Sequence, residues 1–337
     1  MTRFGVFLPT YAYPGEPPPS AAFLQDYARR AEELGFDSVW VFDHLLEAPP
    51  SYKAAFLEPA TSLMLAALAT ERVTIGTGVL VLPLRDPVLT AKMFANIDVL
   101  SGGRLIFGVG VGWAQDEFSA SQVQLSARGR RMDEMLEIII GLWTNDTFAF
   151  EGRHFTIPEI RLLPRPIQTP HPPIWLAGGT VPAGTSQHIT KRPGYSAVPS
   201  IARVARSGQG LMTAYRSAPG LDVSCLVETR GLLHDELRQA GRDPTTVTFA
   251  HHDHVHIDLD PKPERLAAVM TRFTHNRFED AAAMYLMGHP DDLIAKFQAR
   301  IDAGVEEVTF NFLTPDMGQL DLFMSRIRPH LRPRIQG

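Results

Sequence analysis

Two titratable residues, Asp43 and His44, follow an apolar run at residues 39–42 that suits a buried strand. An imidazole exchanges a proton near neutral pH, and a neighbouring carboxylate can orient it or hold a hydroxyl or ring nitrogen of a ligand. If the end of this strand faces a ligand, the pair is suited to acid–base chemistry. A capping aspartate and a structural histidine explain the same residues, so position alone leaves both interpretations open.

Glycines end two further apolar runs. The stretch GVGVGW at residues 108–113 lacks the glycine spacing of a dinucleotide-binding fingerprint, and we expect no helix immediately behind it. Its glycines would let a flat ring approach the backbone, with Trp113 as one wall. The stretch IWLAGGT at residues 174–180 ends in bare N–H groups and a hydroxyl, which suit a phosphate, and Thr213 ends the next strand. Simple tight turns would also account for both stretches.

A histidine-rich segment, HHDHVH, occupies residues 251–256. In a strand, His252, His254 and His256 would lie on one face, with His251 and Asp253 on the other. Three imidazoles could bind zinc in principle, but same-face neighbours in a strand lie about 7 Å apart and no carboxylate motif joins them. We therefore predict no metal, and expect one or two of these histidines at the mouth of a barrel.

The elements that position these residues alternate along the chain. Strands are predicted at residues 3–8, 38–42, 73–79, 104–109, 173–177, 210–213, 246–257 and 307–312. Helices are predicted at residues 20–34, 59–70, 88–100, 128–143, 221–240, 290–303 and 319–330, and a hairpin at residues 147–157. Ser20 suits the N-cap of the first helix and Gly35 its C-terminal end.

Eight strands alternating with helices favour one closed (β/α)8 TIM barrel over an open doubly wound sheet. No stretch resembles a linker, so residues 1–337 are expected to form a single domain. In such barrels ligands bind at the carboxyl ends of the strands, where the stretches above would lie. Residues 178–208, with Pro182, Pro193 and Pro199, are the least regular and predict an insertion loop after the strand that ends in AGG.

Composition excludes several classes of protein. Hydrophobic residues make up 45% and charged residues 20% of the chain, as in ordinary globular proteins. The net charge of −5 and the lack of a Lys/Arg run argue against nucleic acid as a partner. The one cysteine, Cys225, cannot form an internal disulfide, and neither a signal peptide nor a membrane-spanning run is found, so a cytoplasmic protein with no membrane partner is expected.

Four stretches resemble the bacterial luciferase-like flavin-dependent oxidoreductases and monooxygenases, which are (β/α)8 barrels. They read FGVFLPT, AEELGFDSVWVFDH, VTIGTGVLVLPLRDPVLTAKMFANIDVLSGGRLIFGVGVGW and PPIWLAGGT, and all four lie within the first 180 residues. The third is long and specific. It looks most similar to the branch that uses the deazaflavin coenzyme F420.

The resemblance implies roles for the matching positions. His44 would face the reactive edge of the flavin, and Asp43 would contact the ring beside it. A third-strand bulge with a non-proline cis peptide would stand behind the ring. The residues implied to bind the cofactor are Gly78 and Val79 at that bulge, Val109 and Gly110 along the ring, and Gly178, Gly179, Thr180 and Thr213 around the phosphate.

The sequence also departs from the family. Val111 stands in the glycine turn where sugar-phosphate dehydrogenases of the branch carry glutamate, which argues against that substrate. The usual short link from AGG to an Asp-Gly-aromatic strand is replaced by a longer segment that ends in Gln209-Gly210-Leu211.

The leading hypothesis is hydride transfer between a deazaflavin coenzyme and a small organic substrate, with His44 as acid or base. The alternative is an FMN-dependent monooxygenase that uses O2 and reduced FMN from a separate flavin reductase. Lesser alternatives are a non-catalytic flavin-binding barrel and a metal-dependent hydrolase built on the histidine segment. The resemblance also implies a homodimer, for which the apolar helix at residues 61–69 offers one interface.

Overall fold

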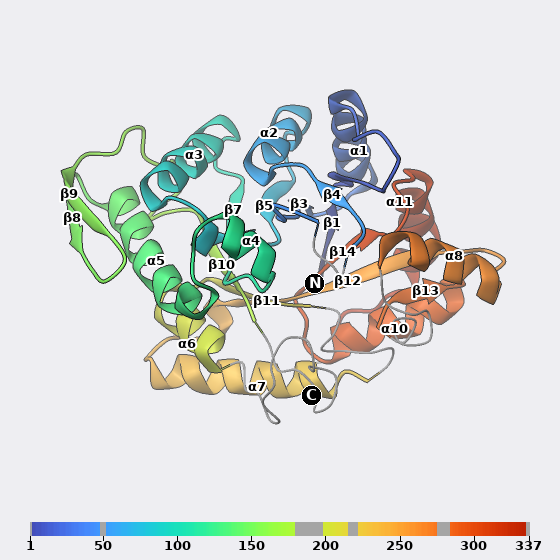
Figure 1. The fold of residues 1–337 in the computed structure, drawn as a ribbon. Helices are drawn as coiled ribbons and strands as arrows, with labels where there is room; N and C mark the ends of the chain where they lie inside the picture. The colour runs from blue at the N-terminus through green and yellow to red at the C-terminus, as the bar shows by residue number, and fades with distance from the viewer. Residues whose placement is uncertain (1, 48–51, 179–197, 215–221, 275–283, 335–337) are drawn as a thin grey trace.

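Eight parallel strands close into a barrel in this computed structural model, which describes residues 2–47, 52–178, 198–214, 222–274 and 284–334 (Figure 1). In order around the barrel they are β1 (Arg3–Phe7), β3 (Ser38–Val41), β5 (Thr74–Thr77), β7 (Leu105–Gly110), β10 (Ile174–Ala177), β11 (Gly210–Ala214), β12 (Thr248–Ile257) and β14 (Glu307–Phe312). Each pairs in parallel with the next, and β14 pairs with β1. All eight predicted strands and the closed barrel are confirmed.

Helices surround this barrel (Figure 1). Those that match predicted helices are α1 (Ala21–Leu34), α2 (Pro59–Ala69), α3 (Pro87–Leu100), α5 (Arg128–Thr144), α7 (Ser224–Gln239) and α10 (Pro290–Asp302). The hydroxyl of Ser20 accepts the N–H of Phe23, and Gly35 adopts a φ of 87°, so α1 begins and ends as predicted. Glycine reaches this left-handed conformation without the steric cost of a side chain.

Side chains of the barrel strands alternate between two cores. Val39 and Phe107 belong to the outer core, between the strands and the helices. The inner core fills the barrel, and its strand residues are Phe7, Trp40, Ile106, Trp175, Met212 and Ala250. Because successive side chains of a strand point to opposite faces, both sets are buried, and the strands read as continuous apolar runs.

A buried polar network closes the amino end of the barrel. The carboxylate of Glu307 accepts hydrogen bonds from Arg3 Nε at 2.7 Å and from the hydroxyl of Ser38 at 2.6 Å. That hydroxyl in turn accepts the indole N–H of Trp40 at 2.7 Å. This network fills the amino end of the barrel interior with hydrogen-bonded side chains.

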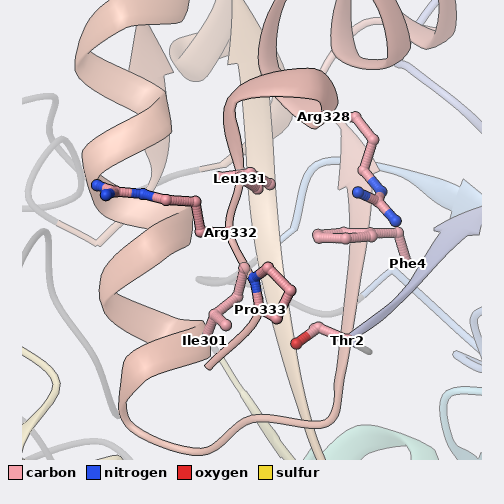
Figure 2. Close-up of a pocket in the computed structure, with 7 residues that line it drawn as sticks. All are labelled: Thr2, Phe4, Ile301, Arg328, Leu331, Arg332 and Pro333. Carbon is pink, nitrogen blue, oxygen red and sulfur yellow. The ribbon is translucent and has the colours of Figure 1, made fainter. Parts of the chain in front are cut away.

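A surface cavity at the amino end is separate from the barrel interior (Figure 2). It is lined by Thr2, Phe4, Ile301, Arg328, Leu331, Arg332 and Pro333. Arg328 lies over the ring of Phe4, with its guanidinium carbon 4.9 Å from the ring centre, whereas Arg332 points away from the group. This cavity lies on the side opposite to the carboxyl ends of the strands.

Three helices depart from the sequence predictions. Residues 178–208, predicted to be irregular, contain α6 (Val198–Ser207), and α8 (Pro263–Phe273) and α4 (Gln115–Ala120) were not predicted. In α6 and α8 a proline stands in the first turn, where its missing N–H costs nothing, so these prolines begin helices rather than break them. The expectation that no helix follows GVGVGW was wrong, because α4 begins two residues after Trp113.

Two smaller predictions were close. The predicted hairpin is the antiparallel pair β8 (Phe148–Glu151) and β9 (Thr156–Ile160). The predicted last helix begins as α11 (Gly318–Leu322) and continues as a π-helical turn and a 3-10 turn to His330. Within the described ranges, no helix is long and apolar enough to cross a membrane.

Candidate active site

The predicted site residues gather at the carboxyl end of the barrel. Asp43 and His44 follow β3, Gly78 and Val79 follow β5, and Gly110 ends β7. Gly178 follows β10, and Thr213 is the second-to-last residue of β11. Since these strands are parallel neighbours, one end of the barrel brings all these positions together. Gly179 and Thr180 lie outside the described residues.

A buried glutamate holds His44. His44 Nδ1 lies 3.2 Å from Glu117 Oε1, and the same oxygen accepts the N–H groups of Leu45 at 2.7 Å and Leu46 at 3.3 Å. Glu117 is 1% exposed, and the His44 side chain 10%. With the carboxylate ionised, Nδ1 carries the proton and donates it, so Nε2 is the nitrogen that can exchange a proton with a ligand.

Glu117 is ionised in spite of its burial. Burial raises the pKa of its carboxyl group, but the hydrogen bonds from His44, Leu46 and Leu45 outweigh burial and lower the pKa below its usual value. Sequence reasoning missed Glu117. Its signal was the acidic pair Asp116-Glu117, which is favourable in the first turn of a helix and marks the beginning of α4.

Asp43 is anchored by the protein. Both of its oxygens lie 2.8 Å from Arg85 Nη2, and Oδ2 also accepts the N–H of Val81 at 2.7 Å. Asp43 is buried. It therefore ties the chain that follows Val79 to the end of β3, a role that leaves little of the carboxylate for a ligand.

Backbone rather than side chain forms the rim at β5 and β7. The peptide bond between Gly78 and Val79 is cis, as the resemblance implied. A Cβ atom at Gly78 would clash with the ring of Phe7, and one at Gly110 would lie 2.7 Å from Val79 Cγ2 and 3.3 Å from Ala177 Cβ. Both positions thus require glycine, because the place of a Cβ atom is already taken by a neighbouring side chain.

The other predicted cofactor residues are placed differently. The side chain of Val109 packs in the outer core, so only its backbone faces the barrel. The hydroxyl of Thr213 lies 2.7 Å from His251 Nδ1, and is buried. Gly178 donates its N–H to the carbonyl of Met212, and a Cβ there would lie 2.6 Å from Ser200 Cβ in α6.

The histidine segment alternates as predicted. His251 and Asp253 face outward, where the buried Arg300 of α10 lies 2.6 Å from Asp253 Oδ2. Burial would raise the pKa of Asp253, but the Arg300 guanidinium outweighs it and holds that pKa well below its usual value. His252 and His254 face inward. In the part of the chain that is described, no group of three His, Cys, Asp or Glu side chains is arranged to hold a metal ion.

Aromatic rings surround His44. Its ring centre lies 5.2 Å from that of Tyr52, 5.1 Å from that of Phe56 and 5.8 Å from that of Trp113. Trp113 is partly exposed at this end of the barrel, as a wall residue would be. Tyr52 and Phe56 were not predicted. An imidazole fixed at Nδ1 and enclosed by rings suits proton transfer to a partly desolvated organic ligand.

Comparisons with known proteins agree with this geometry. The model of the luciferase-like monooxygenase family matches residues 2–307. An F420-dependent glucose-6-phosphate dehydrogenase of Amycolatopsis mediterranei (strain U-32) is 40% identical over 165 residues, 48% of this chain and 49% of that protein. Another, of Microbacterium testaceum (strain StLB037), is 30% identical over 339 aligned residues, 93% of this chain and 94% of that protein.

Solved structures share the fold. An F420-dependent secondary alcohol dehydrogenase in complex with an F420-acetone adduct superposes with a TM-score of 0.75 at 22% identity, over 98% of this chain and 99% of that one. The monooxygenase RslO1 from Streptomyces bottropensis gives a TM-score of 0.75 at 23% identity, over 97% and 99%. With the family model matched over most of its length, the chain belongs to the luciferase-like monooxygenase family.

Proposed function

We propose that this protein is an oxidoreductase that uses the deazaflavin coenzyme F420 to exchange a hydride with a small organic substrate. One observation carries the proposal: His44, fixed by Glu117, lies at the same barrel end as Gly78, Val79 and Gly110. The similarity to F420-dependent dehydrogenases supports the choice of coenzyme.

The residues at this end suit such a coenzyme. Gly78 and Gly110 let the backbone pack against Phe7 and Val79, because a Cβ atom at either position would clash with those side chains, and we assign the flat ring to the rim that Gly78, Val79 and Gly110 form. When bound, a deazaflavin supplies an acceptor or a donor for a hydride. We assign the phosphate to Gly178 with Gly179, Thr180 and Thr213. Thr213 would contribute its hydroxyl only by exchanging its bond to His251.

His44 supplies the proton chemistry of the proposed reaction. In the oxidation of an alcohol, His44 Nε2 would accept the hydroxyl proton while the carbinol carbon gives up a hydride, and a carbonyl group would remain; the coenzyme, when bound, would supply the hydride acceptor. In the reverse direction, His44 returns the proton to the oxygen. Glu117 stabilises the imidazolium in both cases, because its ionised oxygen accepts the Nδ1 proton.

The competing function is a monooxygenase that takes reduced FMN from a separate flavin reductase and reacts with O2. The name of the family favours it. Deazaflavins lack the ring nitrogen that supports oxygen chemistry, so the identity of the coenzyme decides between the two functions.

We also propose a homodimer that associates through α2 and α3. Leu68 of α2 and Leu89 and Leu100 of α3 are exposed apolar side chains on these adjacent helices. Both helices are apolar on nearly all sides, whereas a surface helix normally carries one polar face. Pairing with a second copy would cover this face.

Coenzyme binding tests the proposed function directly. The purified protein, mixed separately with F420 and with FMN, is expected to bind F420 with a Kd of about 1 μM and FMN at least about tenfold more weakly. Quenching of coenzyme fluorescence measures both constants. Gly178→Ala should weaken F420 binding because its Cβ would press on Ser200. Micromolar affinity for FMN with none for F420 would refute the proposed coenzyme and favour the monooxygenase.

Replacement of the acid–base residue tests its role. His44→Ala is expected to retain the Kd for F420 but to lower kcat by about 10²- to 10⁴-fold, the usual contribution of a general acid–base group. Single-turnover kinetics with the alcohols that the wild type oxidises measure the loss. His330→Ala, at an exposed position on the opposite side, is the matched control. Unchanged turnover in His44→Ala removes His44 from the mechanism.

The pH dependence of stability tests the buried glutamate. Folding lowers the pKa of Glu117, so its ionised form stabilises the fold above about pH 4.5, the usual pKa of a glutamate. This stabilisation is lost as the pH falls through the pKa that Glu117 has in the folded protein. Glu117→Gln lacks this titration. Urea unfolding should therefore find the wild type more stable at pH 6, with a difference that shrinks on acidification. If the difference in unfolding free energy between wild type and Glu117→Gln does not change with pH, Glu117 does not have the lowered pKa assigned to it.

The dimer is tested by its mass. Light scattering should give twice the chain mass of 37.3 kDa for the wild type. Leu68→Glu, which places a charge on the proposed interface, should shift the protein to monomers. Val227→Glu, an equally drastic change at an exposed site on α7, should leave the dimer intact. A monomeric wild type, or a Leu68→Glu dimer of undiminished stability, excludes this interface.

A further inference from the structure

A second histidine inside the barrel has no hydrogen-bond partner among the described residues. His252 of β12 is 6% exposed, and both of its ring nitrogens are buried and unpaired. Burial, and then the neighbouring His254, hold the pKa of His252 well below its usual value, so the ring is neutral and offers one donor and one acceptor. Buried polar atoms left unpaired are costly and rare, and those of native proteins commonly await a ligand or water.

The surroundings of His252 are aromatic. Its ring centre lies 4.5 Å from that of Phe7, 5.7 Å from that of Phe42 and 5.0 Å from that of His254. An internal water needs two to four polar partners, and these rings supply few. An organic molecule with an apolar body and a polar group fits these neighbours better.

A closed circuit of ring contacts connects His252 to His44. On one side the path runs through Phe42 and Phe56, and on the other through His254 and Tyr52. We call these six residues, Phe42, His44, Tyr52, Phe56, His252 and His254, the ring circuit. Neighbouring ring centres in it lie between 5.0 and 6.2 Å apart.

The ring circuit occupies one half of the carboxyl end of the barrel. Its members come from the chain that follows β3, from β4 (Ala55–Phe56) and the chain just before it, and from β12, whereas the glycines of the rim lie at the carboxyl ends of β5, β7 and β10 or directly after them. Around the barrel the strands run β12, β14, β1 and β3, so β12 and β3 lie on either side of the pair β14 and β1. This group of four strands lies across the barrel from β7. The end of the barrel thus has a backbone half, suited to a flat coenzyme, and an aromatic half, with His44 where they meet.

We propose that His252 is a substrate-recognition residue: its imidazole hydrogen-bonds a neutral polar substituent of an uncharged organic alcohol or carbonyl compound, whose apolar body packs against the ring circuit. The reacting oxygen meets His44. This inference rests on the proposed function, since it assigns the aromatic half to the substrate of that reaction. It predicts a ring-sized apolar substrate and disfavours a sugar phosphate, whose charge a neutral imidazole cannot compensate.

Binding of two probe compounds tests this role. Calorimetry of the full-length protein loaded with F420 is done with cyclohexanol and with cyclohexane-1,4-diol, which adds one hydroxyl. The diol should bind about five- to tenfold more tightly, the usual value of one added hydrogen bond. In His252→Leu this advantage should disappear, while the Kd values of cyclohexanol and of F420 stay unchanged. Glucose 6-phosphate should bind more weakly than either probe.

Stability separates recognition from a structural role. His252→Leu removes no hydrogen bond found within the described ranges, so its Tm should equal or exceed that of the wild type. His254→Leu is the matched control: His254 hydrogen-bonds the buried Asn311, and its loss should lower the Tm.

Several outcomes would overturn the inference. The inference fails if His252→Leu still binds the diol more tightly than cyclohexanol, or if this variant binds F420 more weakly than the wild type does. It also fails if His252→Leu lowers the Tm as much as His254→Leu does, or if neither probe binds. If the wild-type protein does not bind F420, the proposed function itself is refuted. The probes are therefore also titrated into protein without coenzyme, where the effect of His252→Leu on the diol remains measurable.

Discussion

Parallel closure of the eight-stranded sheet is the constraint on which the rest of this structure depends. Because every barrel strand runs in the same direction, the chain segments that leave β3, β5, β7 and β10 emerge at one end, although they are far apart in sequence. The other end is sealed by the Glu307, Ser38 and Trp40 network. The predicted site residues that the structure describes therefore lie together at the carboxyl end.

Buried charges fix the groups at that end. Asp43 anchors the chain after Val79 through Arg85, and Glu117 sets the tautomer of His44. Each carboxylate has several donors, and a buried charge is tolerated only when it is satisfied in this way. The adjacent residues Asp43 and His44 thus have different contacts. Asp43 binds Arg85 and the N–H of Val81, whereas His44 is held at Nδ1, and its Nε2 is the atom that we assign to proton transfer.

The two halves of the barrel end differ in what they offer to a ligand. Gly78 and Gly110 admit no side chain, because a Cβ atom there would clash with Phe7 or Val79. The opposite half presents rings and His252, which has no hydrogen-bond partner in the described part of the chain. A protein that must hold a flat coenzyme and a smaller molecule against one imidazole gains from this division, since each surface suits one partner.

Local patterns in the sequence determined the eight strands, most of the helices, the cap at Ser20 and the position of His44 after a strand, because hydrophobic periodicity and turn chemistry act between near neighbours. The family resemblance added the cis peptide at Gly78-Val79. Only the tertiary structure decided that Glu117, 73 residues from His44 in sequence, holds its imidazole, and that the rings of β12 and of the chain after β3 form one circuit. Such pairings arise from the closure of the barrel, and no local pattern encodes which distant side chains closure will bring together.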